Sequence, residues 1–202
     1  MSDSLRMWFD PVCPWAWMTS RWLLEAEKVR DIDVTFSVMS LSVLNEGKDD
    51  LSDDYQNLMR MAWGPVRVIV AAARDHGEGV VRPLYDEMGT RIHLQRRRHE
   101  LSAVIAESLE AVGLPSDLAH YADTDEVDDA LRESHAEAIQ RVGNDVGTPV
   151  VAVGEVAFFG PVVSPAPKGE AAGKLLDGCL LVASTAGFFE LKRTRDVDPI
   201  FD

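Results

Sequence analysis

The N-terminal part of the chain changes its hydrophobic period twice within a short distance. Residues 5–9 form an apolar run, and the apolar residues of the segment 17–29 mark a helix. Residues 34–38 then alternate between apolar and polar side chains, as a strand does when one of its faces is buried. The pattern predicts a strand, a helix and a second strand in that order.

The middle of the chain, residues 52–143, is predicted to be almost entirely helical. Ser52 followed by two aspartates is typical of a helix N-terminus. Apolar residues recur at helical spacing in the segments 101–112 and 127–142, and each segment is followed by a glycine. The Gly-Pro pair at 64–65 predicts an interruption, because proline removes a backbone hydrogen bond and clashes with the preceding turn.

The C-terminal part returns to strands. Residues 150–153 and 156–159 are apolar and flank a Gly-Glu turn, which predicts a β-hairpin. A loop rich in glycine and proline, residues 160–167, leads to a last helix at about 169–185. Strands and helices in this order predict an α/β fold in which helices flank a mixed central sheet.

The composition is that of an ordinary soluble globular protein. Hydrophobic residues make up 46% of the 202 residues and charged residues 27%, which supports a buried core. The formal net charge of -14 repels nucleic acids and anionic membranes, so neither is expected as a partner. No run approaches the roughly 20 apolar residues that span a bilayer, and no signal-peptide pattern is present, which favours a cytoplasmic protein.

One of the two cysteines lies where chemistry is expected. Cys13 stands between the first strand and the first helix, where unpaired backbone N–H groups favour thiolate over thiol. We therefore expect its pKa to lie below that of a free thiol. Pro14 suits the first helical turn. The alternative is a small buried hydrophobic residue, which is the expected role of Cys179 in the last helix.

Several motifs resemble those of the DsbA-like branch of the thioredoxin fold. They are DPVCPW at 10–15, MSL at 39–41, AWGPVR at 62–67, GTP at 147–149, FFGP at 158–161 and FFELKRTR at 188–195. The chain looks most like actinobacterial mycothiol-dependent oxidoreductases and nitroreductases, and kappa-class glutathione transferases and 2-hydroxychromene-2-carboxylate isomerases share this architecture. The resemblance implies a thioredoxin-like domain of residues 1–42 and 144–202 and an inserted all-helical subdomain of residues 43–143.

The same resemblance implies a catalytic motif made of residues 13–16. It also implies that the Thr148–Pro149 peptide bond is cis and packs opposite Cys13, where it would help to bind the substrate. The departure is Ala16, because dithiol members have a second, resolving cysteine at that position. Two explanations remain open: a natural enzyme with one active thiol, or a Cys-to-Ala variant of a dithiol enzyme.

Five side chains are further candidates for the site, each with a plain structural alternative. Trp15 is expected to form a wall of an apolar cleft, and its alternative is an ordinary packing aromatic. The backbone of Thr148 is expected to pair with an extended thiol substrate, and its alternative is a plain turn residue. Asn45 and Trp63 are candidates for lining the cleft, although loop capping and core packing also explain them. His93 is a candidate for lowering the thiol pKa, although histidines are more often surface or satisfied core groups.

The leading hypothesis is a thiol-disulfide oxidoreductase in which Cys13 is the single nucleophile. Cys13 forms a mixed disulfide or reduces an electrophile, and a low-molecular-weight thiol then resolves the product on Cys13. The resemblance implies that this co-substrate is mycothiol. No zinc-ligand spacing and no phosphate-binding glycine pattern is present, so neither a metal nor a tightly bound cofactor is expected. Two alternatives are a kappa-class-like transferase or isomerase without a covalent intermediate, and a degenerate binding protein. A homo-oligomer is compatible with each.

Overall fold

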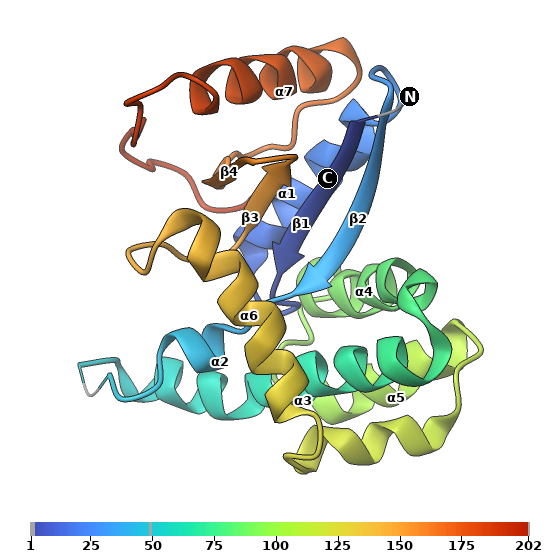
Figure 1. The fold of residues 1–202 in the computed structure, drawn as a ribbon. Coiled ribbons are helices and arrows are strands. Elements are labelled where there is room, and N and C mark those ends of the chain that lie inside the picture. The colour runs from blue at the N-terminus through green and yellow to red at the C-terminus, as the bar shows by residue number, and fades with distance from the viewer. Residues whose placement is uncertain (1–2, 49, 202) are drawn as a thin grey trace.

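A mixed four-stranded sheet forms the centre of the molecule (Figure 1). The computed structural model describes residues 3–48 and 50–201. The strand order across the sheet is β2-β1-β3-β4, with β1 parallel to β2 and antiparallel to β3. The strands are β1 (Asp3–Phe9), β2 (Ile32–Val38), β3 (Val150–Val153) and β4 (Val156–Phe159). The predicted strands, the hairpin and the α/β class are confirmed.

The central strand β1 is buried on both faces, which explains its apolar sequence. Leu5, Met7 and Phe9 belong to the large core on one side of the sheet. Trp8 points the other way, into a smaller cluster that includes Val150. Alternate side chains of a strand face opposite sides, so a strand covered on both sides reads as a continuous apolar run.

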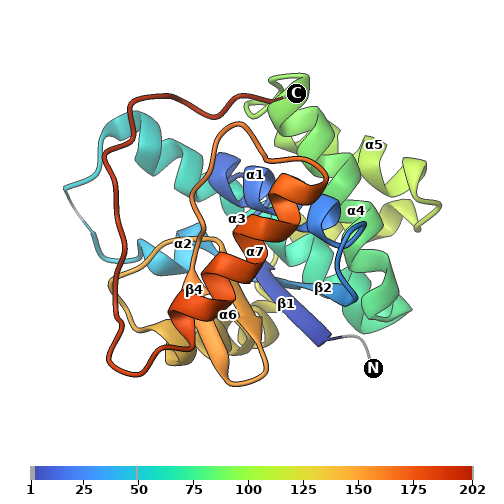
Figure 2. The same cartoon turned by 90° about the horizontal axis from the view of Figure 1, so that it is seen from above.

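Helices cover both faces of the sheet (Figure 2). On one side α1 (Pro14–Ala26) connects β1 to β2 and packs against α7 (Glu170–Ala183), where the indole of Trp22 donates a hydrogen bond to the carbonyl of Ala172 at 3.0 Å. On the other side lies α6 (Asp128–Val142). Within the described part of the chain, no helix is long and apolar enough to cross a membrane.

The segment between β2 and β3 is helical, as predicted. Its elements are α2 (Leu41–Leu44), α3 (Asp53–His76), a 3₁₀ turn (Glu78–Val80), α4 (Val81–Gly89), a π-helical turn (Thr90–Leu94), α5 (Leu101–Ala111), a 3₁₀ segment (Ser116–Asp123) and α6. The predicted interruption at Gly64 is wrong, because α3 continues through Pro65. Ala62, Val66 and Ile69 are fully buried around it, and this packing offsets the roughly 3 kcal/mol cost of an interior proline.

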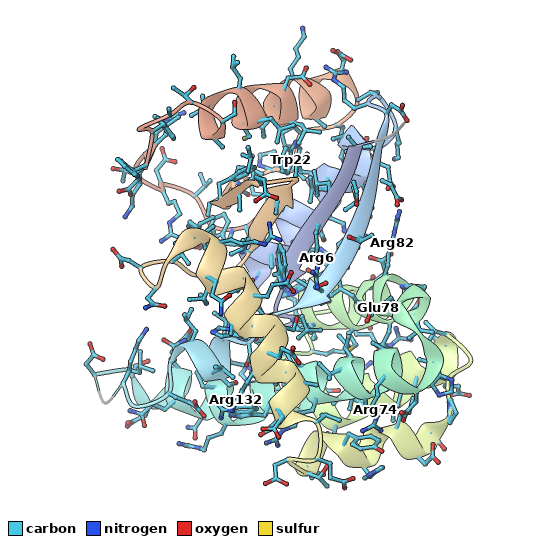
Figure 3. All side chains as sticks on the ribbon, in the orientation of Figure 1. Arg6, Trp22, Arg74, Glu78, Arg82 and Arg132 are labelled. Atoms are coloured by element: carbon cyan, nitrogen blue, oxygen red, sulfur yellow. The ribbon has the colours of Figure 1, made fainter. Side chains whose placement is uncertain are left out.

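Ion pairs tie α6 to the elements on either side of it. Arg6 of β1 meets Glu137 at 2.7 Å, and Arg132 meets Glu46, in the loop after α2, at 2.7 Å. Figure 3 shows Arg6 and Arg132 on the two sides of this helix. The side chains are about 40% exposed, so these pairs contribute little free energy of folding and mainly fix the orientation of α6.

Candidate active site around Cys13

Cys13 forms the N-cap of α1, at the carboxyl end of the central strand. After β1 ends at Phe9, the chain makes a tight turn in which the N–H of Cys13 donates to the carbonyl of Asp10 at 3.0 Å. Pro14 then occupies the first helical position, and the Cys13 Sγ accepts a hydrogen bond from the N–H of Ala16 at 3.4 Å. The predicted junction of strand, thiol and helix is confirmed.

The Thr148–Pro149 peptide lies directly against this thiol. The peptide bond is cis, and the Cys13 Sγ lies 3.4 Å from the carbonyl oxygen of Thr148. Thr148 immediately precedes Pro149 and β3, which pairs with β1, so the sheet itself brings these two distant parts of the sequence together. The hydroxyl of Thr148 is buried and has no hydrogen-bond partner among the described residues.

The expectation of a lowered thiol pKa is wrong for this arrangement. Only 5% of Cys13 is exposed, and burial raises the pKa of its thiol to about 12. The hydrogen bond from the Ala16 N–H lowers the pKa, in the direction expected at a helix N-terminus, and the charge of Asp10 raises it. Loss of water outweighs the helix effect, so the thiol is protonated at neutral pH in this conformation.

Asp10 is a buried carboxyl group beside the thiol that the sequence argument did not single out. Its two oxygens accept hydrogen bonds from the N–H of Val12 at 2.9 Å and of Leu41 at 2.7 Å. Burial raises the pKa of Asp10 to about 7, although both hydrogen bonds lower it. A carboxyl group in an apolar motif directly after a strand was the available sequence signal. Its contacts join the turn that carries Cys13 to the start of α2.

Trp15 lies in the first turn of α1 and is half-buried. The guanidinium carbon of Arg195 lies 5.4 Å from the centre of its ring. The two residues are far apart in the sequence, and sequence reasoning did not link them. Trp15 therefore has one side against the core and a cation on its ring, beside the candidate nucleophile.

His93 supports the active-site turn but does not supply a positive charge. It is 6% exposed, and its Nε2–H donates to the carbonyl of Pro11 at 2.9 Å. Burial lowers the pKa of His93 to about 4, so the ring is neutral at physiological pH. The expectation that it lowers the pKa of Cys13 by its charge is therefore wrong. His135 is also buried, and it accepts a hydrogen bond from the N–H of Ser40 at 3.2 Å.

Asn45 and Trp63 meet at a surface pocket of about 210 Å³ whose lining does not include Cys13. The side chain of Asn45 donates to the carbonyl of Leu41 at 2.8 Å, which is the capping role given as its alternative. Burial raises the pKa of the Tyr55 phenol, and the charges of Cys13 and Asp10 raise it further, whereas a hydrogen bond with Asn45 lowers it. That Asn45 and Trp63 bind substrate stays a prediction.

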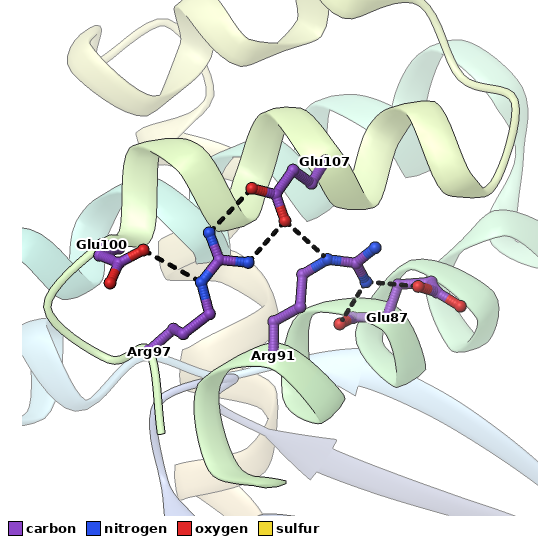
Figure 4. Close-up of polar contacts among 5 residues, drawn as sticks. All are labelled: Glu87, Arg91, Arg97, Glu100 and Glu107. Atoms are coloured by element: carbon purple, nitrogen blue, oxygen red, sulfur yellow. Dashed lines mark hydrogen bonds and ion pairs between the residues drawn. The ribbon is translucent and has the colours of Figure 1, made fainter. Parts of the chain in front are cut away.

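Arg91 and Arg97 form an ion-pair network with three glutamates (Figure 4). Arg97 contacts both oxygens of Glu107, at 2.6 and 2.8 Å, and Glu100 at 3.0 Å. Arg91 joins the same carboxylate and also pairs with Glu87. Hydrogen bonding to Arg97 lowers the pKa of Glu107 to about 2.

The second cysteine is not the core residue that the sequence predicted. Cys179 is partly exposed in α7. Gly178 and Leu181, which lie near it on the same helix, are exposed as well. Both cysteines are free thiols. Among residues 3–48 and 50–201, no three His, Cys, Asp or Glu side chains form a group that could hold a metal ion.

Comparison with known proteins shows a family and a relative that each match most of the chain. A family model described as Rv2466c-like, mycothiol-dependent nitroreductase Rv2466c, matches residues 12–193. The uncharacterized protein Rv2286c of Mycobacterium tuberculosis is 26% identical over 190 residues, covering 93% of this chain and 80% of that protein.

Solved structures share the fold at low sequence identity. The probable DsbA oxidoreductase SCO1869 of Streptomyces coelicolor has a TM-score of 0.56 at 16% identity, over 97% of this chain and 94% of its own. The cytosolic disulfide reductase DsbM of Pseudomonas aeruginosa, solved with GSH, has a TM-score of 0.55 at 20% identity, over 88% and 99%. A 2-hydroxychromene-2-carboxylate isomerase has a TM-score of 0.52 at 15% identity, over 78% and 88%. These neighbours confirm the DsbA-like thioredoxin fold.

Proposed function

Because the chain belongs to the Rv2466c-like family of mycothiol-dependent nitroreductases, we propose that it is a thiol-dependent oxidoreductase whose nucleophile is Cys13 and whose co-substrate is mycothiol. The observation that supports this most directly is the contact of the Cys13 Sγ with Thr148, next to the cis bond to Pro149. The sulfur there lies between a helix N-terminus and an extended backbone with which a thiol substrate can pair.

The proposed reaction needs one protein sulfur. The Cys13 thiolate attacks one sulfur of a disulfide, a new S–S bond forms, and the other half of the substrate leaves as a thiolate. Mycothiol then attacks the mixed disulfide and returns Cys13 to its reduced form. With a reducible electrophile, the substrate takes two electrons as Cys13 and one mycothiol become a mixed disulfide, which a second mycothiol reduces. Ala16 cannot act as a resolving residue, which is why an external thiol is required.

The reaction also requires the thiol to lose its proton. In the described conformation burial keeps the pKa of Cys13 at about 12, so we propose that the reactive state is one in which the sulfur gains water or a polar substrate. The N–H of Ala16 already donates a hydrogen bond to the sulfur and would stabilise the negative charge of the thiolate. The neutral His93 and the buried Asp10 supply no cation for this purpose.

Mass spectrometry of the intact protein tests the proposal. After incubation with the disulfide of mycothiol, we expect the wild-type mass to rise by one mycothiol and to return on addition of reduced mycothiol. Cys13→Ser should take up none, whereas the matched control Cys179→Ser should behave as the wild type. An adduct that disappears with Cys179→Ser and persists with Cys13→Ser would refute the assignment.

One observation favours a second candidate. A buried, protonated Cys13 is suited to hydrogen-bonding a bound thiol without a covalent bond, as in a transferase or isomerase of this architecture. If this second function is correct, the protein should show no mass increase after incubation with the disulfide of mycothiol. The Cys13→Ser variant should then retain activity, because a hydroxyl also donates a hydrogen bond. If the chain is a degenerate binding protein, neither an adduct nor turnover should be observed.

We place the reaction in the reducing environment of the cytoplasm. Cys13 and Cys179 are both free thiols, and such a compartment keeps them reduced. The partners proposed are small molecules, a thiol and a disulfide or another electrophile.

A further inference from the structure

Residues 184–201, which follow α7, form no helix or strand, yet contacts hold residues 198–201 against the rest of the molecule. We call residues 186–201 the C-terminal segment. The hydroxyl of Ser164 donates to the carbonyl of Asp198 at 3.2 Å and accepts from the N–H of Ile200 at 2.8 Å. The ring of Phe201 lies 5.5 Å from that of His93 and packs on the main core. Figure 2 shows the segment running around the outside of the molecule to end near α4.

These attachments bring a cation to the candidate active site. Between α7 and the contacts of Ser164, the segment passes the first turn of α1, where Arg195 lies over the ring of Trp15 at 5.4 Å. Trp15 is two residues after Cys13. His93, on which Phe201 rests, holds the carbonyl of Pro11, two residues before Cys13. The C-terminal segment therefore contacts Trp15 directly, and it is linked to Pro11 through His93.

Arg195 is one of five arginines that form no ion pair among the described residues; the others are Arg60, Arg96, Arg98 and Arg193. The net charge is -14, and ten other arginines form ion pairs with carboxylates. Among the residues that the structure describes, no carboxylate pairs with Arg195. A guanidinium that lies over an aromatic ring can still donate hydrogen bonds from its N–H groups, whose geometry matches the two oxygens of a carboxylate.

We infer that Arg195 determines substrate specificity, selecting disulfides or other electrophiles that bear a carboxylate or another anionic group. The inference rests on the proposed function, because it concerns what Cys13 attacks. In the step concerned, Cys13 forms an S–S bond with one half of the disulfide, and the other half leaves as a thiolate while Arg195 holds the anionic group. Trp15 keeps the guanidinium at the first turn of α1, the helix that begins directly after Cys13. Ser164 and Phe201 keep the segment in place.

The test compares two disulfides that differ mainly in charge. Dithiodipropionate carries two carboxylates, and its dimethyl ester has the same disulfide and no charge. The rate at which Cys13 forms a mixed disulfide with each is followed by intact mass in a single turnover. We expect Arg195→Ala to slow the reaction with the dianion about five-fold, the size of one partly exposed charged contact, and to leave the ester unaffected.

Arg193→Ala is the matched control. It removes the same charge from the same segment, but Arg193 makes no aromatic contact among the described residues. A long-range charge effect would slow both variants equally with the dianion and would overturn the inference. Unchanged selectivity in Arg195→Ala would overturn it as well. Phe201→Ala, which leaves the cation but releases the end of the segment, is expected to lose the same preference.

The proposed function and this inference fail in distinguishable ways. If wild-type Cys13 reacts with both disulfides and the rates do not depend on residue 195, only the specificity role is refuted. If Cys13 reacts with neither disulfide, the nucleophilic role itself is refuted, and the specificity role falls with it.

Discussion

At the scale of single residues, the chemistry of Cys13 depends on a competition between two effects. The helix N-terminus stabilises the thiolate through the Ala16 N–H, whereas burial and the carboxylate of Asp10 destabilise it. Burial dominates because the thiolate loses all of its hydration, whereas it gains only one N–H hydrogen bond, at 3.4 Å, in return. The local sequence specifies the first effect, and the surrounding fold specifies the second.

A pH profile of alkylation measures this balance. In a Cys179→Ser background, we expect the reaction of Cys13 with iodoacetamide to keep accelerating above pH 9, because the thiol pKa is raised to about 12. The urea-unfolded chain should level off near pH 9. Asp10→Asn removes a neighbouring negative charge and should move the folded profile toward lower pH. A folded profile that levels off below pH 8 would contradict the structure.

At the scale of elements, one close contact sets how near α4 lies to α1, the helix that begins after Cys13. Gly89, the last residue of α4, faces the ring of Trp17 in α1, and a Cβ on Gly89 would overlap that ring. Trp17 also packs edge-on against Tyr85 of α4, with ring centres 5.6 Å apart. The absence of a side chain at Gly89 therefore lets α4 pack closely against α1, whose N-cap is Cys13.

We expect Gly89→Ala to lower the free energy of unfolding by about 2 kcal/mol, because overpacking forces the two helices apart. Gly79→Ala is the control, since a Cβ there would meet no atom within 4 Å. Urea denaturation of both variants measures the difference. Equal stability of the two would show that α1 and α4 are free to separate at no cost.

At the scale of the whole molecule, two buried groups give opposite pH dependences of stability. Burial raises the pKa of Asp10 from 3.8 to about 7, so its contribution is complete below pH 4 and is lost as the pH rises through 7. Burial lowers the pKa of His93 from 6.5 to about 4, so its contribution is complete above pH 6.5 and is lost as the pH falls through 4. Between pH 4 and 6.5 the two slopes largely cancel.

Single variants should reveal each slope. Relative to the wild type, the free energy of unfolding of Asp10→Asn should rise with pH between 4 and 6.5, by at most about 1.4 kcal/mol per unit. That of His93→Gln should fall over the same range, relative to the wild type. Urea denaturation at several pH values provides the measurement, and parallel curves for all three proteins would refute the assigned burial of both groups.

The sequence alone specified the order of strands and helices and the position of Cys13 at a helix start. These features depend on periodicity and on residues adjacent in the chain, such as Pro14. The limits of this reasoning appear at Pro65, where local preference predicted a break and tertiary packing preserved the helix. The division into residues 1–42 with 144–202 and 43–143 stays a prediction.

Only the tertiary structure decided what surrounds the sulfur. The sheet places Thr148 against Cys13, the fold removes water from the thiol, and the C-terminal segment brings Arg195 to Trp15. None of these follows from local sequence, because each joins residues distant in the chain and depends on which surfaces exclude water. Hydrophobic periodicity records which face of an element is buried, and it carries no information about its partner.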